Sequence, residues 1–161
     1  MSGNMGTSKE RSIVVICALD TKGEEARLVR EYVAARGHRP VVVNTGVVGE
    51  PAFTPEVSAA DIAKAGGTSL EVLRQKGDRG EAVAAMAQGA AAMAERLLRE
   101  GQLDGIVGLG GSAGTAVASA AMRAVPVGVP KVLVSTVASG NVAPYVGTKD
   151  IALMYSVVVT S

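Results

Sequence analysis

The chain has 161 residues, enough for one domain with an ordinary hydrophobic core. Its 16 basic and 15 acidic residues give a net charge of +1, and it contains no tryptophan and one phenylalanine. So small a charge and so few aromatic side chains argue against nucleic acid or an acidic membrane surface as the partner. No run of about 20 apolar residues is present, so we also expect no membrane span.

The single cysteine, Cys17, excludes a disulfide within the chain and favours a reducing, cytoplasmic compartment. Residues 1–11 lack the apolar centre of a signal peptide, and we expect them to be a disordered leader or residues added by cloning. Residues 12–161 are then one Rossmann-like nucleotide-binding domain. Its apolar last segment runs to the end of the chain, which indicates a domain cut from a longer two-domain protein.

Apolar runs of strand length alternate along the chain with stretches of helical periodicity. The order is strand, helix, strand with short joints, and such units build parallel sheets with right-handed crossovers. We therefore predict an α/β fold, a Rossmann-like three-layer sandwich with a mostly parallel sheet of about five strands. The strands are expected at 13–19, 40–44, 105–109, 131–135 and 151–159, and the helices at 24–36, 57–65, 69–75, 79–100 and 112–123.

The helix over 79–100 has an apolar stripe at spacings of three and four residues, which must be buried. The stripe packs on the sheet, or part of it forms a seam between two copies, with Gly89 and Ala90 allowing a close approach. The shorter helix over 69–75 is predicted to open with a capping box from Thr68 to Glu71. The stripe consists of Val83, Met86, Ala90, Met93 and Leu97.

Polar clusters follow three strands, and the carboxyl edge of a parallel sheet is where ligands bind. They are residues 20–23, the glycine-rich segment 108–115, and residues 136–150. In the second cluster, glycines let the backbone approach phosphate oxygens while the following helix offers free N–H groups. The alternative is a tight turn in which glycine serves only to fit. The predicted nucleotide-binding residues are Asp20, Thr21, Lys22, Gly108, Gly110, Gly111, Ser112, Gly114, Thr115, Thr136, Ser139, Gly140 and Asn141.

Other uses of the glycine-rich segment fit less well. The Gly-x-x-x-x-Gly-Lys-Ser/Thr string of a P-loop is absent. A dinucleotide-binding fingerprint starts at Gly108, but no acidic residue between Asp104 and Asp150 could hold the ribose. A nucleophile elbow centred on Ser112 would need a histidine base, and the one histidine, His38, is expected at the opposite edge of the sheet.

The carboxylates and lysines expected at or near the ligand edge complete the candidate chemistry. With one Cys and one His, a metal cluster of those residues is impossible, and Mg²⁺ held by carboxylates stays open. Asp20 and Asp150 are the carboxylates for it, while Lys22 and Lys149 would balance phosphate charge.

Four strings in this order resemble the amino-terminal domain of the UPF0261 family, with its Tm-1-like ATP-binding domain. They begin at Ala18, Gly108, Ser135 and Val146, and the resemblance covers residues 12–158. The resemblance implies an ATP-binding Rossmann-like domain that is followed by a second α/β domain and forms a homodimer. It also implies that Thr21 and the glycine-rich loop face the nucleotide, and it implies no defined reaction.

Three functions follow from this sequence. The first is an ATP-binding or other nucleotide-binding domain that holds phosphates on the loop after the third strand. The second is an enzyme acting on a phosphorylated or carboxylated small molecule, completed by the second domain, with Asp20 or Lys22 in acid or base work. The third is a regulatory module that dimerises through the long helix and is stabilised by nucleotide.

Overall fold

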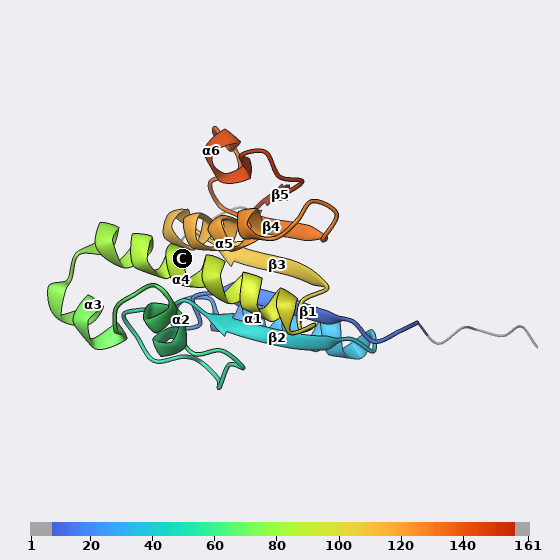
Figure 1. The fold of residues 1–161 in the computed structure, drawn as a ribbon, viewed down its shortest axis with the longest axis horizontal. Coiled ribbons are helices and arrows are strands. Elements are labelled where there is room, and N and C mark those ends of the chain that lie inside the picture. Colours follow the sequence, from blue (N-terminus) through green and yellow to red (C-terminus); the bar gives the residue numbers. More distant parts are fainter. Residues whose placement is uncertain (1–7, 157–161) are drawn as a thin grey trace, which may run out of the picture.

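The computed structural model describes residues 8–156. Residues 1–7 of the expected leader and residues 157–159 of the expected last strand lie outside this range. Five strands form one parallel sheet in the order β2-β1-β3-β4-β5 (Figure 1). The predicted α/β class is thus confirmed, and the described sheet is parallel throughout. The strands are β1 (Ser12–Cys17), β2 (Arg39–Asn44), β3 (Gly105–Gly110), β4 (Lys131–Ser135) and β5 (Ala152–Tyr155).

The direction of the chain across the sheet reverses once, around β1. Ile13 pairs with Pro40 of β2 on one side and with Gly105 of β3 on the other. The chain therefore moves outward from β1 to β2 and then crosses back over β1 to β3. Such a reversal leaves a crevice at the carboxyl ends of the two strands, where α/β proteins bind their ligands.

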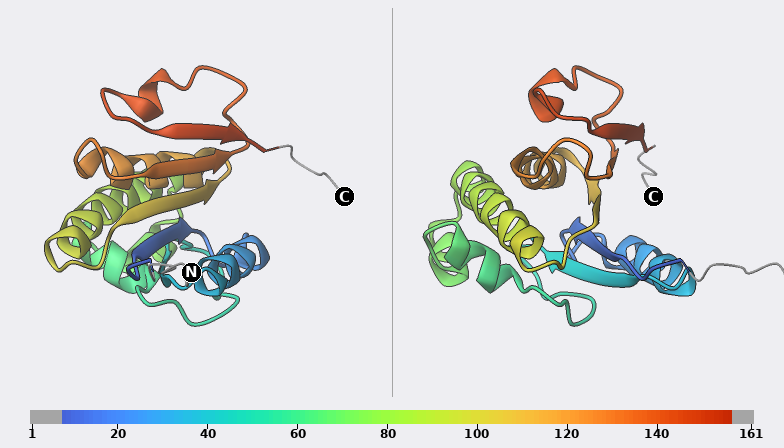
Figure 2. Two further views of the ribbon diagram at one scale, coloured as in Figure 1. Left: turned by 90° about the vertical axis from the view of Figure 1, so that its right-hand side faces the viewer. Right: turned by 45° about the vertical axis from the view of Figure 1, so that its right-hand side comes forward.

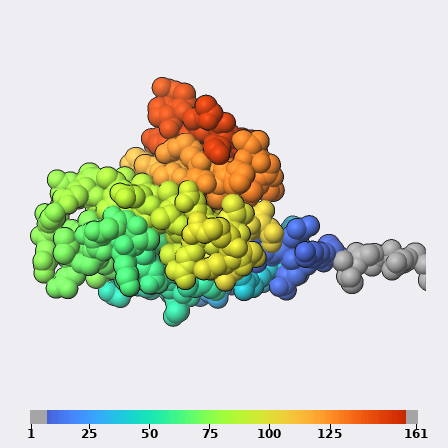
Figure 3. All heavy atoms as spheres, in the orientation of Figure 1, coloured from blue at the N-terminus to red at the C-terminus, as the bar shows by residue number. Residues whose placement is uncertain are grey.

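Helices cover the sheet unequally on its two faces. Figure 2 shows α1 alone on one face, with α4 and α5 on the other. A short helix, α6, lies in the polar segment 136–150, and with β5 it forms a tip at one end of the molecule (Figure 3). The helices are α1 (Gly23–Ala35), α2 (Ala59–Ala65), α3 (Leu70–Lys76), α4 (Arg79–Arg99), α5 (Ser112–Ala124) and α6 (Ala143–Val146).

Side chains alternate along the strands between two hydrophobic clusters. Val14 and Ile16 enter the larger cluster with the helices α2, α4 and α5. Val15 and Cys17 enter the smaller cluster with α1. Burial on both faces explains why β1 is a continuous apolar run rather than an alternating one.

The apolar stripe of α4 is buried within the chain. Met86, Ala90 and Leu97 each expose 4% of their surface or less. A Cβ atom added at Gly89 would overlap the carbonyl oxygen of Ile62 in α2, so glycine is what lets the two helices approach. Gly89 and Ala90 are therefore used by packing inside the domain, so the alternative in which these two residues close a seam between copies does not hold. The homodimer itself stays a prediction.

The start of α3 differs from the predicted capping box by one residue. Ser69, not Thr68, is the N-cap, and its hydroxyl accepts a hydrogen bond from the amide of Val72 at 3.1 Å. The carboxylate of Glu71 accepts instead from the side chain of Gln75. Among the helices of residues 8–156, none has the length and apolar character needed to cross a membrane.

Candidate functional site

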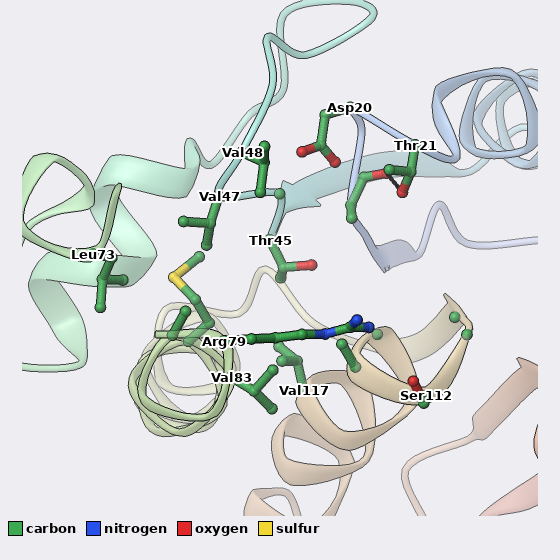
Figure 4. Close-up of a pocket in the computed structure, with 18 of the residues that line it drawn as sticks. Asp20, Thr21, Thr45, Val47, Val48, Leu73, Arg79, Val83, Ser112 and Val117 are labelled. Carbon is green, nitrogen blue, oxygen red and sulfur yellow. Dashed lines mark hydrogen bonds between the residues drawn. The ribbon is translucent and has the colours of Figure 1, made fainter. Parts of the chain in front are cut away.

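A cavity of about 740 Å³ lies at the crevice between β1 and β3 (Figure 4). The loops after β1, β2 and β3 supply one part of its wall, and α3, α4, α5 and the corner between α3 and α4 supply the rest. This is the edge at which the sequence predicted a ligand. Its volume is within the range of small-molecule sites, roughly 300–1,000 Å³.

Three helices of eight or more residues begin at this cavity. Lys22 immediately precedes α1, Arg79 opens α4 and Ser112 opens α5, and all three residues line the cavity. The N-cap residues of α1 and α5, Lys22 and Gly111, make no capping hydrogen bond with their side chains. The first amide groups of these two helices therefore have no side-chain cap, and helix N-termini with such donors attract anions.

The glycines of the loop after β3 divide into two kinds. A Cβ at Gly108 would come within 2.8 Å of the side chains of Ala118 and Leu133, and one at Gly110 within 2.5 Å of the carbonyl carbon of Gly114. Gly108 is not among the residues that line the cavity. These two glycines are required by packing, as the tight-turn alternative supposed.

Gly111 and Gly114 are the second kind. The nearest atom to a Cβ at Gly111 would be the hydroxyl oxygen of Thr136, 3.8 Å away, and at Gly114 it would be the carbonyl oxygen of Leu109, 3.4 Å away. Both glycines line the cavity. The fold has room for a side chain at either position, so packing does not explain why glycine is there.

The two predicted hydroxyl donors of the loop are in different places. Ser112 is exposed and lines the cavity (Figure 4). Thr115 is fully buried, and its hydroxyl is 2.6 Å from the hydroxyl of Ser135 in β4. Thr115 therefore links α5 to β4 and offers no donor to the cavity.

Asp20, Thr21 and Lys22 all line the cavity. Asp20 also shapes it, because its Oδ2 accepts a hydrogen bond from the amide of Gly49 at 3.0 Å. Its Oδ1 is buried and has no hydrogen-bond partner among residues 8–156. Buried polar atoms usually have a partner, so this oxygen stands out as an unused acceptor.

Sequence reasoning missed Asn44, the last residue of β2. Its side chain is buried, and its Oδ1 accepts hydrogen bonds from the amides of Leu19 at 3.0 Å and Gly46 at 2.9 Å. Asn44 thus ties the loop after β1 to the loop after β2 and fixes this side of the cavity. A polar residue that ends a buried strand was the available signal.

Arg79 was also missed, since the sequence indicated only that a helix begins there. Its side chain extends from α4 across the cavity toward the first turn of α5 (Figure 4). Arg74, also at the wall, donates to the backbone carbonyl of Val47 at 2.6 Å. By contrast, within the described chain Arg79 has neither an ion pair nor a side-chain hydrogen bond.

The opposite side of the cavity is apolar. Figure 4 shows Leu73 and Val47 gathered on that side, facing away from Thr21 and Ser112. The cavity therefore has a polar, cationic end at the glycine-rich loop and an apolar end under α3 and α4. The apolar lining residues from α3, α4 and the loop after β2 are Val47, Val48, Leu73, Ala82, Val83 and Met86.

The predicted wall after β4 does not line the cavity. Thr136 donates its amide to the carbonyl of Gly110, and Gly140 donates to the carbonyl of Val137. The side chain of Asn141 accepts a hydrogen bond from the amide of Ala143, the first residue of α6. Ser139 is exposed. None of these four predicted residues is among those that line the cavity.

Asp150 lies at the other edge of the sheet, so its predicted place near the ligand edge is wrong. Its carboxylate is 2.7 Å from the ammonium of Lys131, the first residue of β4, and accepts from the amide of Gly128. These hydrogen bonds, that from Lys131 first, lower the pKa of Asp150 to about 2. Lys149, its neighbour, does not line the cavity either.

The remaining reactive side chains have structural positions. His38, which precedes β2, accepts a hydrogen bond from the amide of Arg11 at 3.2 Å, far along the sheet from Ser112. Burial raises the pKa of the Cys17 thiol to about 12, which leaves it unreactive. Residues 8–156 contain no group of three His, Cys, Asp or Glu side chains suited to a metal.

Comparison with known proteins agrees with the resemblance seen in the sequence. A UPF0261 protein of Clostridium tetani is 47% identical over 148 residues, which are 92% of this chain and 37% of the relative. A UPF0261 protein of Rhizobium meliloti is 41% identical over 147 residues, 91% of this chain and 36% of the relative. The chain thus spans little more than a third of the length of these curated relatives.

A plant protein shares part of this similarity. The ToMV susceptible protein tm-1(GCR26) of Solanum lycopersicum is 46% identical over 80 residues, half of this chain and 11% of that protein. Residues 11–160 match the N-terminal domain of the uncharacterised protein family UPF0261. The chain therefore belongs to the UPF0261 family and corresponds to its N-terminal domain.

Proposed function

We propose that this domain binds a nucleotide, ATP in the first instance, with the phosphates at the glycine-rich loop. The observation that carries the proposal is the convergence of two helix N-termini without a side-chain cap, those of α1 and α5, on one cavity at the reversal of the sheet. Helix N-termini attract negative charge, and the crevice at a reversal is the usual ligand site of such sheets.

The phosphate end of the ligand would lie against Gly111 and Gly114. Because a side chain at either position would meet only ordinary contacts inside the protein, the benefit of glycine there is close approach of a ligand to the backbone. Ser112 adds a hydroxyl, and Lys22 adds a positive charge from the other wall. Charge-assisted hydrogen bonds of this kind are the stronger ones in phosphate sites.

The adenosine would lie against the apolar end of the cavity. Leu73 and Met86 are buried there, and Val83 is half-buried beside them. The volume of about 740 Å³ accommodates a ligand of nucleotide size.

Mg²⁺ is compatible with the residues present. Asp20 offers one buried carboxylate oxygen without a partner among residues 8–156, and Asp78, the other carboxylate at the cavity, already caps α4. Mg²⁺ is commonly held by one or two carboxylates together with phosphate oxygens and water. Asp20 would hold the ion, which would neutralise phosphate charge.

The test is a thermal-shift panel with ATP, ADP, AMP and NAD⁺, each with and without Mg²⁺. ATP at about 100 times its dissociation constant should raise the midpoint by roughly 5–10 °C, because it binds the folded state alone. Asp20→Asn keeps an oxygen for Gly49 but removes the charge, so it should abolish any additional shift caused by Mg²⁺. A chain whose midpoint responds to none of the four nucleotides at millimolar concentration would contradict the proposal.

A further inference from the structure

We infer that Arg79 is a phosphate-binding residue of this site, and that the ligand is a polyphosphate, held from two walls, rather than a monophosphate. The inference rests on the proposed function and names a ligand class for it. Its basis is the position of Arg79, which reaches from α4 across the cavity toward the glycine-rich loop (Figure 4).

Nothing in the fold accounts for Arg79. Its side chain is exposed, and within residues 8–156 it makes no ion pair or hydrogen bond. The other arginine at the cavity, Arg74, donates to the carbonyls of Val47 and Gly49 and so holds the loop after β2 against α3. Arg74 has a structural role, and the guanidinium of Arg79 is left with five donors that nothing in the described chain uses.

The dipole of α4 also opposes a cation at this position. Asp78 caps the helix by accepting from the amide of Glu81 at 2.8 Å, and Glu81 supplies the acidic residue expected of a first turn. Arg79 stands between them at the first helical position, where the helix dipole disfavours positive charge. A residue that breaks such a local rule without a structural gain is most simply explained by function.

Two phosphate-binding walls follow from the arrangement. A single phosphate at Gly111–Gly114 is already served by the first amides of α5. Arg79 and Lys22 come from two other helices, and Asp20 is the one carboxylate of the cavity that does not cap a helix. Two cations beyond the loop match the additional negative charge of a second and third phosphate.

The experiment is calorimetric titration of the chain with ATP and with AMP, for the wild type, Arg79→Gln and Arg99→Gln. Arg99 is the matched control, since it is an exposed arginine of the same helix, at the end far from the cavity. Arg79→Gln should weaken ATP binding roughly tenfold or more, which is the loss expected for a charged hydrogen bond. It should weaken AMP binding less than about twofold. Arg99→Gln should change neither affinity.

Arg79→Lys tests the role of the planar guanidinium and provides a second variant with the charge retained. It should recover part of the ATP affinity, because an ammonium keeps the charge but not the forked donors. Melting temperatures without nucleotide should be the same for all variants, since the Arg79 side chain is exposed.

The outcomes separate the two proposals. Wild-type protein that binds neither nucleotide overturns the proposed function, and this inference with it. If the wild type binds ATP and Arg79→Gln binds it equally tightly, the inference alone is overturned. An equal loss for ATP and AMP, or an equal loss in Arg99→Gln, would also overturn it.

Discussion

The amino edge and the carboxyl edge of the sheet treat their polar side chains in opposite ways. At the amino end of β4, the ammonium of Lys131 is fully buried and donates to the carbonyls of Pro126 and Val129 and to Asp150. At the cavity between β1 and β3, Arg79 has no such partner in the described chain, and Asp20 keeps a buried oxygen unpaired. Polar groups that satisfy one another hold the fold, whereas groups left unsatisfied at a cavity are available to a ligand.

The same contrast exists within the glycine-rich loop, between Gly110 and Gly111. Gly110→Ala should cost about 3 kcal/mol of unfolding free energy, because the new methyl group would press on the backbone of Gly114 and Thr115. Gly111→Ala should cost less than about 0.5 kcal/mol, since its methyl group meets only ordinary contacts. Urea unfolding of both variants measures the difference, and equal losses would break the distinction.

Lys131 and Arg79 provide a second comparison, between a paired and an unpaired cation. Lys131→Met should lower the unfolding free energy by about 2 kcal/mol, because two backbone carbonyls lose a charged donor. Arg79→Gln should leave the unfolding free energy unchanged, as its side chain is exposed. If Arg79→Gln proved the more destabilising of the two in urea, Arg79 would have a structural role.

The smallest expected effect is the pH dependence of the Lys131–Asp150 pair. The pKa of Asp150 is about 2 in the folded protein, chiefly because Lys131 donates a hydrogen bond to it, and about 4 for an ordinary aspartate. A carboxylate with a lowered pKa stabilises the fold at every pH above its ordinary pKa, and this contribution is lost as the pH falls through about 4 to 2. The stability advantage of the wild type over Asp150→Asn should therefore shrink across that window in pH-dependent melting. An advantage that stays constant down to about pH 2 would show that the Lys131–Asp150 pair does not stabilise the fold.

Much of the fold was predictable from the sequence because local patterns determine it. Strands buried on both faces appear as apolar runs, and β1 to β4 lie within two residues of their expected bounds. The helix over 112–123 and the glycine-rich turn before it were likewise found. Thr68 was mistaken for the cap of α3, because the neighbouring Ser69 satisfies the same local chemistry.

The site was less predictable, because it depends on contacts between distant segments. Residues 136–150 were assigned to one edge, but this segment crosses the sheet from the carboxyl end of β4 to the amino end of β5. Asp150 is thereby carried to the far edge. Arg79 reaches the cavity only because the corner after α3 folds over it, and no local pattern encodes that placement.

The most direct test of the account is calorimetric titration with ATP of the wild type, Gly111→Val and Gly140→Val. Gly140 is the control, because a Cβ there also has room and the residue does not line the cavity. The account predicts saturable binding to the wild type and to Gly140→Val, with the affinity of Gly111→Val lowered by about tenfold or more as the side chain blocks the phosphates. Unchanged ATP affinity in a folded Gly111→Val protein would contradict the claim that the glycine-rich loop is the phosphate site.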